Sequence, residues 1–343
     1  MIEGRSSADE LTNWRTHALR IEAAVSEVMV GQDEAIRLLC IAVFTRGHVI
    51  LEGNVGVGKT TLLRAFARAI GGGYERIEGT VDLMPSDLVY YTYVDTNGKP
   101  QVAPGPLLKH GDTLATFFFN EVNRARPQMH SLLLRVMAER SVTAFNRDYR
   151  FPHLQVFADR NRVEREETFE IPAAARDRFL MEIEIDSPTD PVLLRHLMVD
   201  TRFHDTDRLL MQVPPDIVDY RELNSVAEAI QSHIHTSETI QQYAFDLCHA
   251  TSQPGVYGVR LPDTDMARLI QAGVSPRGMS QLLRAARVAA WLNGHDSVLP
   301  EDVHDVFLVI VTHRIFFRPA YEIHRAELAK ELTDRILQSV ATP

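Results

Sequence analysis

The run Gly53-Asn54-Val55-Gly56-Val57-Gly58-Lys59-Thr60 matches the spacing G-x-x-x-x-G-K-T, and no other feature constrains the fold of this chain as strongly. The segment before it, 47–52, is apolar and predicts a buried strand, whereas 61–70 has apolar residues at helical spacing. A glycine-rich turn between a strand and a helix presents bare backbone N–H groups and a helix N-terminus to an anion. The run therefore predicts a binding site for a nucleoside triphosphate.

The side chains at the end of this run have separate roles in such a site. The Lys59 ammonium can reach the β- and γ-phosphates, and the Thr60 hydroxyl can ligate Mg²⁺. ATP and Mg²⁺ are therefore the expected cofactors. The residues expected to contact the nucleotide are Gly53, Asn54, Val55, Gly56, Val57, Gly58, Lys59, Thr60 and Thr61.

Composition limits the other classes of function. The chain has 343 residues, 45% of them apolar, which is enough for two or three globular domains. The 36 Lys and Arg residues against 46 Asp and Glu give a net charge of −10, which opposes broad binding to nucleic acid or anionic lipid. Cys40 and Cys248 are the only cysteines, and no apolar run approaches the ~20 residues of a membrane span. The cytoplasm is the expected location.

Two local features are interpreted without a functional role. The segment Ile2-Glu3-Gly4-Arg5 is a familiar engineered protease site without the apolar core of a signal peptide, so residues 1–9 are expected to be a cloning remnant or disordered. His233 and His235 form an isolated His-x-His pair, which is more typical of a helix surface than of a metal site.

The order of strands and helices predicts two domains. Strand candidates at 74–77, 113–119 and 154–158 alternate with helical stretches, which favours a mostly parallel sheet covered on both faces. The pattern changes near residues 187–191, and beyond residue 213 almost every segment has helical periodicity. We therefore expect an α/β domain over residues 10–190, a linker over 191–214 and a helical domain over 215–343.

Two hairpins are expected to interrupt the α/β domain. The first lies within residues 80–105 and has an Asn97-Gly98 turn, and the second spans 141–152. Neither belongs to a minimal nucleotide-binding core, so each is interpreted as an insertion with its own purpose.

The apolar run 114–119 ends in Asn120 and Glu121, at the position where P-loop enzymes keep a metal partner and a catalytic base. Glu121 is predicted to accept a proton from the water that attacks the γ-phosphate, and the less favoured alternative is that it only caps the helix beyond. Asn120 is anomalous, because this position normally holds an aspartate whose charge offsets Mg²⁺. An amide keeps the acceptor and loses the charge, so we predict that ATP binds while Mg²⁺ is held less tightly and turnover is slow.

Further polar residues are candidates for the same chemistry. Asn161 is predicted to orient the attacking water, with Asp159 as the competing choice. Arg178, or its neighbour Arg176, could stabilise charge on the γ-phosphoryl oxygens, in a neighbouring subunit's site. Arg277 opens an apolar helix and either meets the γ-phosphate or is a plain helix-terminal arginine.

In this order, these motifs resemble the MoxR family of AAA+ ATPases, from about Val30 to about Phe317. The motifs that carry the resemblance are Val30-Gly31-Gln32, the 53–60 run, Leu83-Met84-Pro85-Ser86-Asp87-Leu88, Gly105-Pro106-Leu107, Asn120-Glu121-Val122-Asn123-Arg124-Ala125, Asp177-Arg178-Phe179, Ser275-Pro276-Arg277 and His313-Arg314. The resemblance implies a P-loop AAA+ core followed by an all-helical lid. It also assigns Lys59 and Thr60 to Walker A, Asn120 and Glu121 to Walker B, Asn161 to sensor 1, Arg178 to the arginine finger and Arg277 to sensor 2.

The same resemblance implies an oligomeric state and a molecular function. Family members look like chaperone-type remodellers that form rings, usually hexameric, and commonly act with a partner containing a von Willebrand factor A domain. The two hairpins would then face the central pore, where Tyr90, Tyr91 and Tyr93 either grip a protein client or pack along one hairpin face.

The chain departs from the family at three places. Asn120 replaces an aspartate, Asp159-Arg160-Asn161-Arg162 replaces a Thr-Gln-Asn-Pro stretch, and Arg176 replaces an apolar residue. The leading interpretation is an ATP-driven remodeller of a partner protein. The alternatives are a nucleotide-gated scaffold with little hydrolysis and, against the acidic balance, a nucleic-acid motor.

Overall fold

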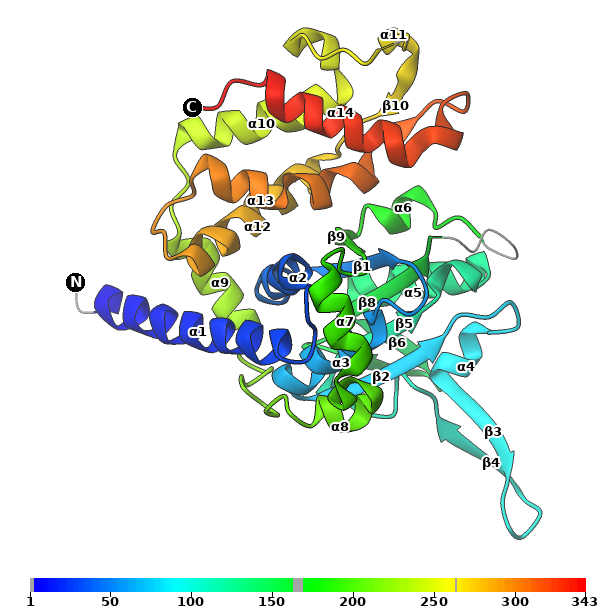
Figure 1. The fold of residues 1–343 in the computed structure, drawn as a ribbon. Helices are drawn as coiled ribbons and strands as arrows, with labels where there is room; N and C mark the ends of the chain where they lie inside the picture. The colour runs from blue at the N-terminus through cyan, green and yellow to red at the C-terminus, as the bar shows by residue number, and fades with distance from the viewer. Residues whose placement is uncertain (1–2, 163–168, 263) are drawn as a thin grey trace. The chain divides into compact units, whose positions relative to one another are not determined.

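The computed structural model describes residues 3–162, 169–262 and 264–343, and packing divides the chain into two units (Figure 1). The first, here called the α/β unit, comprises Thr16–Arg178 and Ile183–Asn224. The second, the helical unit, comprises Met1–Arg15, Phe179–Glu182 and Ser225–Pro343.

A five-stranded sheet organises the fold, with strand order β2-β5-β8-β1-β9. The strands are β1 (His48–Gly53), β2 (Gly73–Glu78), β5 (Leu114–Asn120), β8 (Gln155–Asn161) and β9 (Phe179–Ile185). The pairs β2–β5, β5–β8 and β8–β1 are parallel. Every residue of β5 is buried, as expected for a central strand covered on both faces. The predicted mostly parallel α/β core is confirmed.

Helices lie around this sheet in the α/β unit (Figure 1). They are α2 (Asp33–Thr45), α3 (Lys59–Ile70), α4 (Pro85–Val89), α5 (Pro127–Glu139), α6 (Ala173–Arg176), α7 (Pro191–Val199) and α8 (Thr206–Leu210). Short 3₁₀ turns, η1 (Gly111–Thr113), η2 (Val122–Arg124) and η3 (Thr201–His204), complete the unit. Proline at the first turn of α5 and of α7 fixes the direction of the chain at both starts.

Residues 191–214, expected as a linker, instead carry α7, η3 and α8. The segment that follows is tied to α3, because Arg68 Nε donates to the Val213 carbonyl at 2.7 Å and Asp216 N donates to the Arg68 carbonyl at 3.0 Å. The Arg68–Val213 contact joins residues 145 positions apart, which local periodicity in the sequence does not reveal.

The two expected hairpins are present. The first pairs β3 (Tyr90–Val94) with β4 (Pro100–Pro104), and Figure 1 shows it extending away from the sheet. The second pairs β6 (Ser141–Ala144) with β7 (Arg147–Arg150). Their aromatic residues meet, because the rings of Tyr90 and Phe145 lie 5.2 Å apart.

The second unit is almost entirely helical. It contains α9 (Leu223–His233), α10 (Glu238–Ser252), α11 (Met266–Leu269), α12 (Pro276–Asn293), α13 (Pro300–Val311) and α14 (Arg325–Ser339), with turns η4 (Pro254–Tyr257), η5 (Thr312–Arg314) and η6 (Glu322–His324) and the short strands β10 (Ile270–Ala272) and β11 (Phe316–Phe317). Arg314 is 1% exposed, and its guanidinium donates to the Leu180 carbonyl at 3.1 Å and to the Phe179 carbonyl. Backbone carbonyls and the Gln281 side chain therefore accept hydrogen bonds from both terminal nitrogens of this buried guanidinium.

The first helix, α1 (Glu3–Ser26), begins within the segment 1–9 that was expected to be disordered. Met1 and Ile2 lie outside the described residues. Trp291 Nε1 donates to the Leu11 carbonyl at 3.1 Å, so the early part of α1 packs in the helical unit. Among the residues described, no helix is long and apolar enough to cross a membrane.

Candidate active site

The predicted phosphate cradle connects β1 to α3. Gly58 caps α3 with φ of 90°, a left-handed conformation in which a side chain would be strained. Gly53 needs its bare Cα for another reason, since an added Cβ would lie 2.2 Å from the Ile185 carbonyl oxygen. The exposed backbone of Asn54, Val55 and Gly56 and the start of α3 therefore form a surface suited to phosphate.

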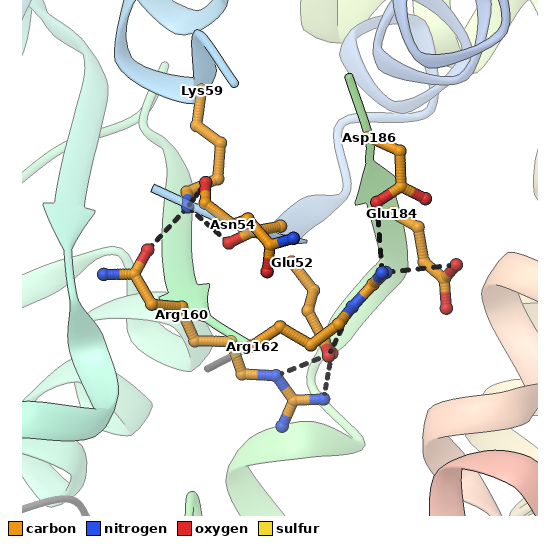
Figure 2. Close-up of polar contacts among 9 residues, drawn as sticks. Glu52, Asn54, Lys59, Arg160, Arg162, Glu184 and Asp186 are labelled. Carbon is orange, nitrogen blue, oxygen red and sulfur yellow. Dashed lines mark hydrogen bonds and ion pairs between the residues drawn. The ribbon is translucent and has the colours of Figure 1, made fainter. Parts of the chain in front are cut away.

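Lys59 is held between the cradle and the end of β8. Its ammonium, 7% exposed, donates to the Gly53 carbonyl at 2.7 Å, the Asn54 carbonyl at 3.2 Å and Asn161 Oδ1 at 2.7 Å. Figure 2 shows this ammonium beside Asn54. The cation and Asn161, predicted separately from two distant motifs, are therefore in direct contact.

Glu121 lies directly after β5 and faces the same cluster. Its Oε1 accepts a hydrogen bond from Asn161 Nδ2 at 3.1 Å, and its Oε2 pairs with Arg124 Nη1 at 2.9 Å. Its backbone adopts φ of 53°, which is uncommon for a residue with a side chain, and its N–H donates to Asp159 Oδ1 at 2.5 Å. The Glu121 side chain makes no cap hydrogen bond to the turn that follows it, η2.

Asn120 is 6% exposed and its amide is turned toward a neighbouring strand. Asn120 Nδ2 donates to Glu78 Oε1 at 2.7 Å, at the end of β2. Glu78 also pairs with Arg76 at 2.9 Å and is half exposed. Glu78 was not among the residues expected at the site, although it directly follows the strand candidate 74–77. In the structure it pairs with Asn120 across β2 and β5.

Asp159 belongs to the site as well. It is 2% exposed, and its Oδ2 lies 3.8 Å from Lys59 Nζ. Burial raises the pKa of its carboxyl to about 6, while the Glu121 N–H and the Lys59 charge lower it. Because side chains alternate along a strand, Asp159 and Asn161 share one side of β8. The two competing sequence candidates are thus both brought to Lys59.

Arg160 and Arg162 join a separate charged cluster (Figure 2). Arg160 Nε donates to Glu52 Oε2 at 2.9 Å, and Arg162 Nε lies 3.4 Å from Glu52 Oε1. Arg162 also pairs with Glu184 at 3.2 Å and with Asp186 at 3.0 Å. This cluster, here called the strand-end cluster, joins the ends of β1, β8 and β9 next to the cradle.

Two of the candidate arginines, Arg176 and Arg178, belong to the α/β unit, and Arg277 belongs to the helical unit. Arg178 is half-buried, and its Nη1 donates to the Leu134 carbonyl at 2.7 Å. Arg176, the competing choice, is buried at 8% exposed. Arg277 is exposed in the helical unit, at the start of α12, where Ser275 Oγ caps the helix by accepting the Gly278 N–H at 3.2 Å.

The side chains around the cradle fit Mg²⁺ in their chemistry. Thr60, Glu78, Asn120 and Asp159 all offer oxygen atoms, which this hard cation prefers. No group of three or more His, Cys, Asp or Glu side chains in the described ranges is arranged to hold a metal by itself. An ion here would therefore take ligands from nucleotide phosphates, as Mg²⁺ commonly does in ATPases.

Comparison with known proteins agrees with this geometry. Two family descriptions match: "ATPase family associated with various cellular activities (AAA)" over residues 48–181, and "AAA lid domain" over residues 263–338. A solved structure of a candidate ATPase from Cytophaga hutchinsonii superposes with a TM-score of 0.85, at 29% identity, covering 100% of both chains. The cradle, the parallel sheet and the lid define this protein as an AAA+ ATPase.

Full-length relatives narrow the class. The chain is 57% identical to Protein MoxR of Methylorubrum extorquens, over 97% of both chains, and 54% identical to Protein MoxR of Paracoccus denitrificans, over 97% of this chain and 98% of the relative. It is 30% identical to Chaperone MoxR1 of Mycobacterium tuberculosis, over 93% of this chain and 80% of the relative. Within the AAA+ class, the chain belongs to the MoxR family.

Proposed function

We propose that this protein is a chaperone-type remodeller that binds and hydrolyses ATP to activate or rearrange a partner protein in the cytoplasm. The observation that carries the proposal is the cluster of Lys59, Glu121 and Asn161, joined by hydrogen bonds of 2.7 and 3.1 Å beside the cradle. The name of the relative Chaperone MoxR1 of Mycobacterium tuberculosis supports the chaperone assignment.

The hydrolytic step follows from these side chains. The Glu121 carboxylate accepts the proton of the attacking water, and Asn161, already bonded to Glu121, orients that water. Lys59 exchanges its contacts with the cradle carbonyls for the β- and γ-phosphates. The Thr60 hydroxyl and strand-end carboxyl or amide oxygens would hold Mg²⁺, which neutralises charge on the phosphates.

Assembly extends the proposal. The protein acts as a hexameric ring, in which Arg178 or Arg176 of one subunit stabilises the γ-phosphoryl charge in the next subunit, and Arg277 senses nucleotide from the lid. A protein with a von Willebrand factor A domain is the proposed partner. The side chains of Tyr91 (54% exposed) and Tyr93 (49% exposed), whose ring centroids lie 6.3 Å apart, form an aromatic surface on the hairpin that a protein client would contact.

Asn120 keeps a second function open, a scaffold whose ring assembles on ATP with little hydrolysis. An amide at the end of β5 predicts slower turnover than an aspartate would allow, unless another carboxylate supplies the missing charge. A nucleic-acid motor is the least supported function, since the net charge of −10 opposes binding to a polyanion.

Steady-state ATPase assays of the wild type and Glu121→Gln test the proposal. The substitution keeps the hydrogen-bonding shape of the side chain and removes its basicity, so the expected loss in kcat is on the order of 10²-fold or more. Nucleotide affinity should change little, whereas Lys59→Ala should abolish it. Equal rates in the wild type and Glu121→Gln would favour the scaffold, and a wild type that binds no ATP would refute both functions.

A further inference from the structure

The two strands that end at the cradle carry an unexpected distribution of charge. Phe119 of β5 pairs with Ala158 of β8, so Asn120 and Asp159 occupy the next position on each strand. Asn120, a neutral amide, occupies the position on β5 where a carboxylate near Mg²⁺ is expected. Asp159, a carboxylate, occupies the corresponding position on the adjacent strand β8.

Asp159 is placed to act electrostatically at this site. Its carboxylate is 2% exposed, its Oδ2 is 3.8 Å from Lys59 Nζ, and its Oδ1 accepts the N–H of Glu121. Its compensation consists of one backbone donor, the Lys59 ammonium 3.8 Å away and the longer-range charge of Arg76, which is little for a carboxylate removed from water. A divalent cation nearby would supply the remaining compensation.

Glu78 is the other carboxylate near Asn120, and it is less suited to this role. Its side chain is 52% exposed and its Oε2 is already paired with Arg76 at 2.9 Å. Solvent and the guanidinium both reduce the field that Glu78 exerts on a cation at the cradle. The Asn120 amide occupies its second oxygen at 2.7 Å.

We propose that Asp159 supplies the negative charge near Mg²⁺ that the end of β5 lacks. In this arrangement the carboxylate lies on β8, and the amide Asn120 occupies the position on β5 where a carboxylate is expected. This assignment rests on the proposed ATPase function and adds a positioning residue to it. Asp159 holds the backbone of Glu121 through one oxygen and attracts Mg²⁺ to the nucleotide through its charge. The slow turnover predicted from Asn120 alone is then offset by the neighbouring strand.

The test measures binding of a fluorescent ATP analogue in Mg²⁺ and in EDTA, so its readout does not depend on turnover. Four variants are compared with the wild type: Asp159→Asn, Asn120→Asp, the double variant carrying both changes, and Glu78→Gln. Asp159→Asn keeps an oxygen that can accept the Glu121 N–H and removes only the charge. Its melting temperature and its affinity in EDTA show whether the site remains folded.

We expect Mg²⁺ to strengthen wild-type binding and Asp159→Asn to lose about tenfold or more of that gain, with affinity in EDTA retained. The double variant should recover most of the gain, because the charge returns to the adjacent strand. Asn120→Asp alone should add no Mg²⁺ dependence, since it places a second carboxylate beside Asp159. Glu78→Gln should change the Mg²⁺ gain by less than about threefold.

Several results would overturn the assignment. One is an Asp159→Asn variant with wild-type Mg²⁺ dependence, and another is a large increase in Mg²⁺ affinity from Asn120→Asp in the presence of Asp159. If Asp159→Asn fails to fold, the Mg²⁺ affinity of Asn120→Asp compared with that of the wild type still tests the assignment. A loss of the Mg²⁺ gain confined to Glu78→Gln would transfer the role to Glu78. A wild type that binds no nucleotide in either condition would instead refute the proposed function itself.

Discussion

At the scale of single residues, the strand leading into the cradle begins with a buried histidine that must stay neutral. His48 Nδ1 accepts the Val156 N–H at 2.9 Å, which places the ring proton on Nε2, and Nε2 donates to the Met137 carbonyl at 3.2 Å. Burial lowers the pKa of His48 from 6.5 to about 3, because a charged ring would lose its water. Protonation would also remove the acceptor that Val156 uses.

Acid should therefore destabilise the α/β unit partly through His48. Between pH 6.5 and about 3 the unfolded chain binds a proton at this ring that the folded chain does not, so the free energy of unfolding falls as pH falls. One such group contributes a slope of up to about 1.4 kcal/mol per pH unit. Urea unfolding of the wild type and His48→Gln at pH 7.5, 6 and 5 should give a shallower slope for the variant. Parallel slopes would contradict the prediction.

The sequence placed Glu121 and Asn161 shortly after two apolar runs, and in the structure these side chains share a hydrogen bond of 3.1 Å. Their catalytic roles stay a prediction. The sequence favoured Asn161 over Asp159, but strand alternation places both on one side of β8. The contacts of Arg160 and Arg162 with Glu52 were not predictable for another reason, since Glu52 is more than a hundred residues away from both.

At the scale of elements, the strand-end cluster links three strands next to the cradle. Glu52 is the shared acceptor, contacted by Arg160 from β8 and by Arg162 just beyond it, and its side chain is 16% exposed. Because β1 runs directly into the cradle, the position of Glu52 influences where the phosphate-binding backbone lies. This link depends on pairing between distant strands, which periodicity does not reveal.

Glu52→Gln should lower both stability and nucleotide affinity. The change leaves two guanidiniums without their shared carboxylate, and we expect a loss of about 1–3 kcal/mol in the free energy of unfolding. Nucleotide affinity should fall several-fold. The matched control is Glu139→Gln in the exposed Arg135–Glu139 pair of α5, where both side chains are 52% exposed and about 0.5 kcal/mol or less is expected. Thermal unfolding and nucleotide titration of both variants measure the difference, and equal losses would contradict a special role for Glu52.

At the scale of the whole molecule, the sequence predicted the order of an α/β part and a helical part but not their boundaries. Residues 191–214 pack in the α/β unit, while Phe179–Glu182 of β9 and the beginning of α1 group with the helical unit. From the sequence, a domain boundary is placed where alternating strands and helices give way to helices alone. Packing, in contrast, can group segments such as Leu11 and Trp291 that lie far apart in the chain.

The proposed ring makes a prediction that no single subunit can satisfy. If Arg178 acts in the neighbouring subunit's site, an Arg178→Ala protomer retains its own Glu121, and a Glu121→Gln protomer retains an arginine to donate. Each variant alone should be nearly inactive, yet an Arg178→Ala site beside a Glu121→Gln neighbour is complete. In a randomly mixed ring about a quarter of the sites have that arrangement, so mixing should restore up to about a quarter of wild-type activity.

The measurement is steady-state ATPase activity of equimolar mixtures after subunit exchange, with each variant alone at the same total concentration. Arg176→Ala, mixed in the same way, decides between the two arginines, because only the trans-acting one should show recovery. Arg176 is buried at 8% exposed, so its variant also needs a melting temperature to separate lost folding from lost catalysis. If Arg178 completed the site of its own subunit, mixing would restore nothing, because no protomer would hold both Glu121 and Arg178. Recovery near a quarter therefore requires sites shared between subunits, which a monomeric ATPase cannot provide.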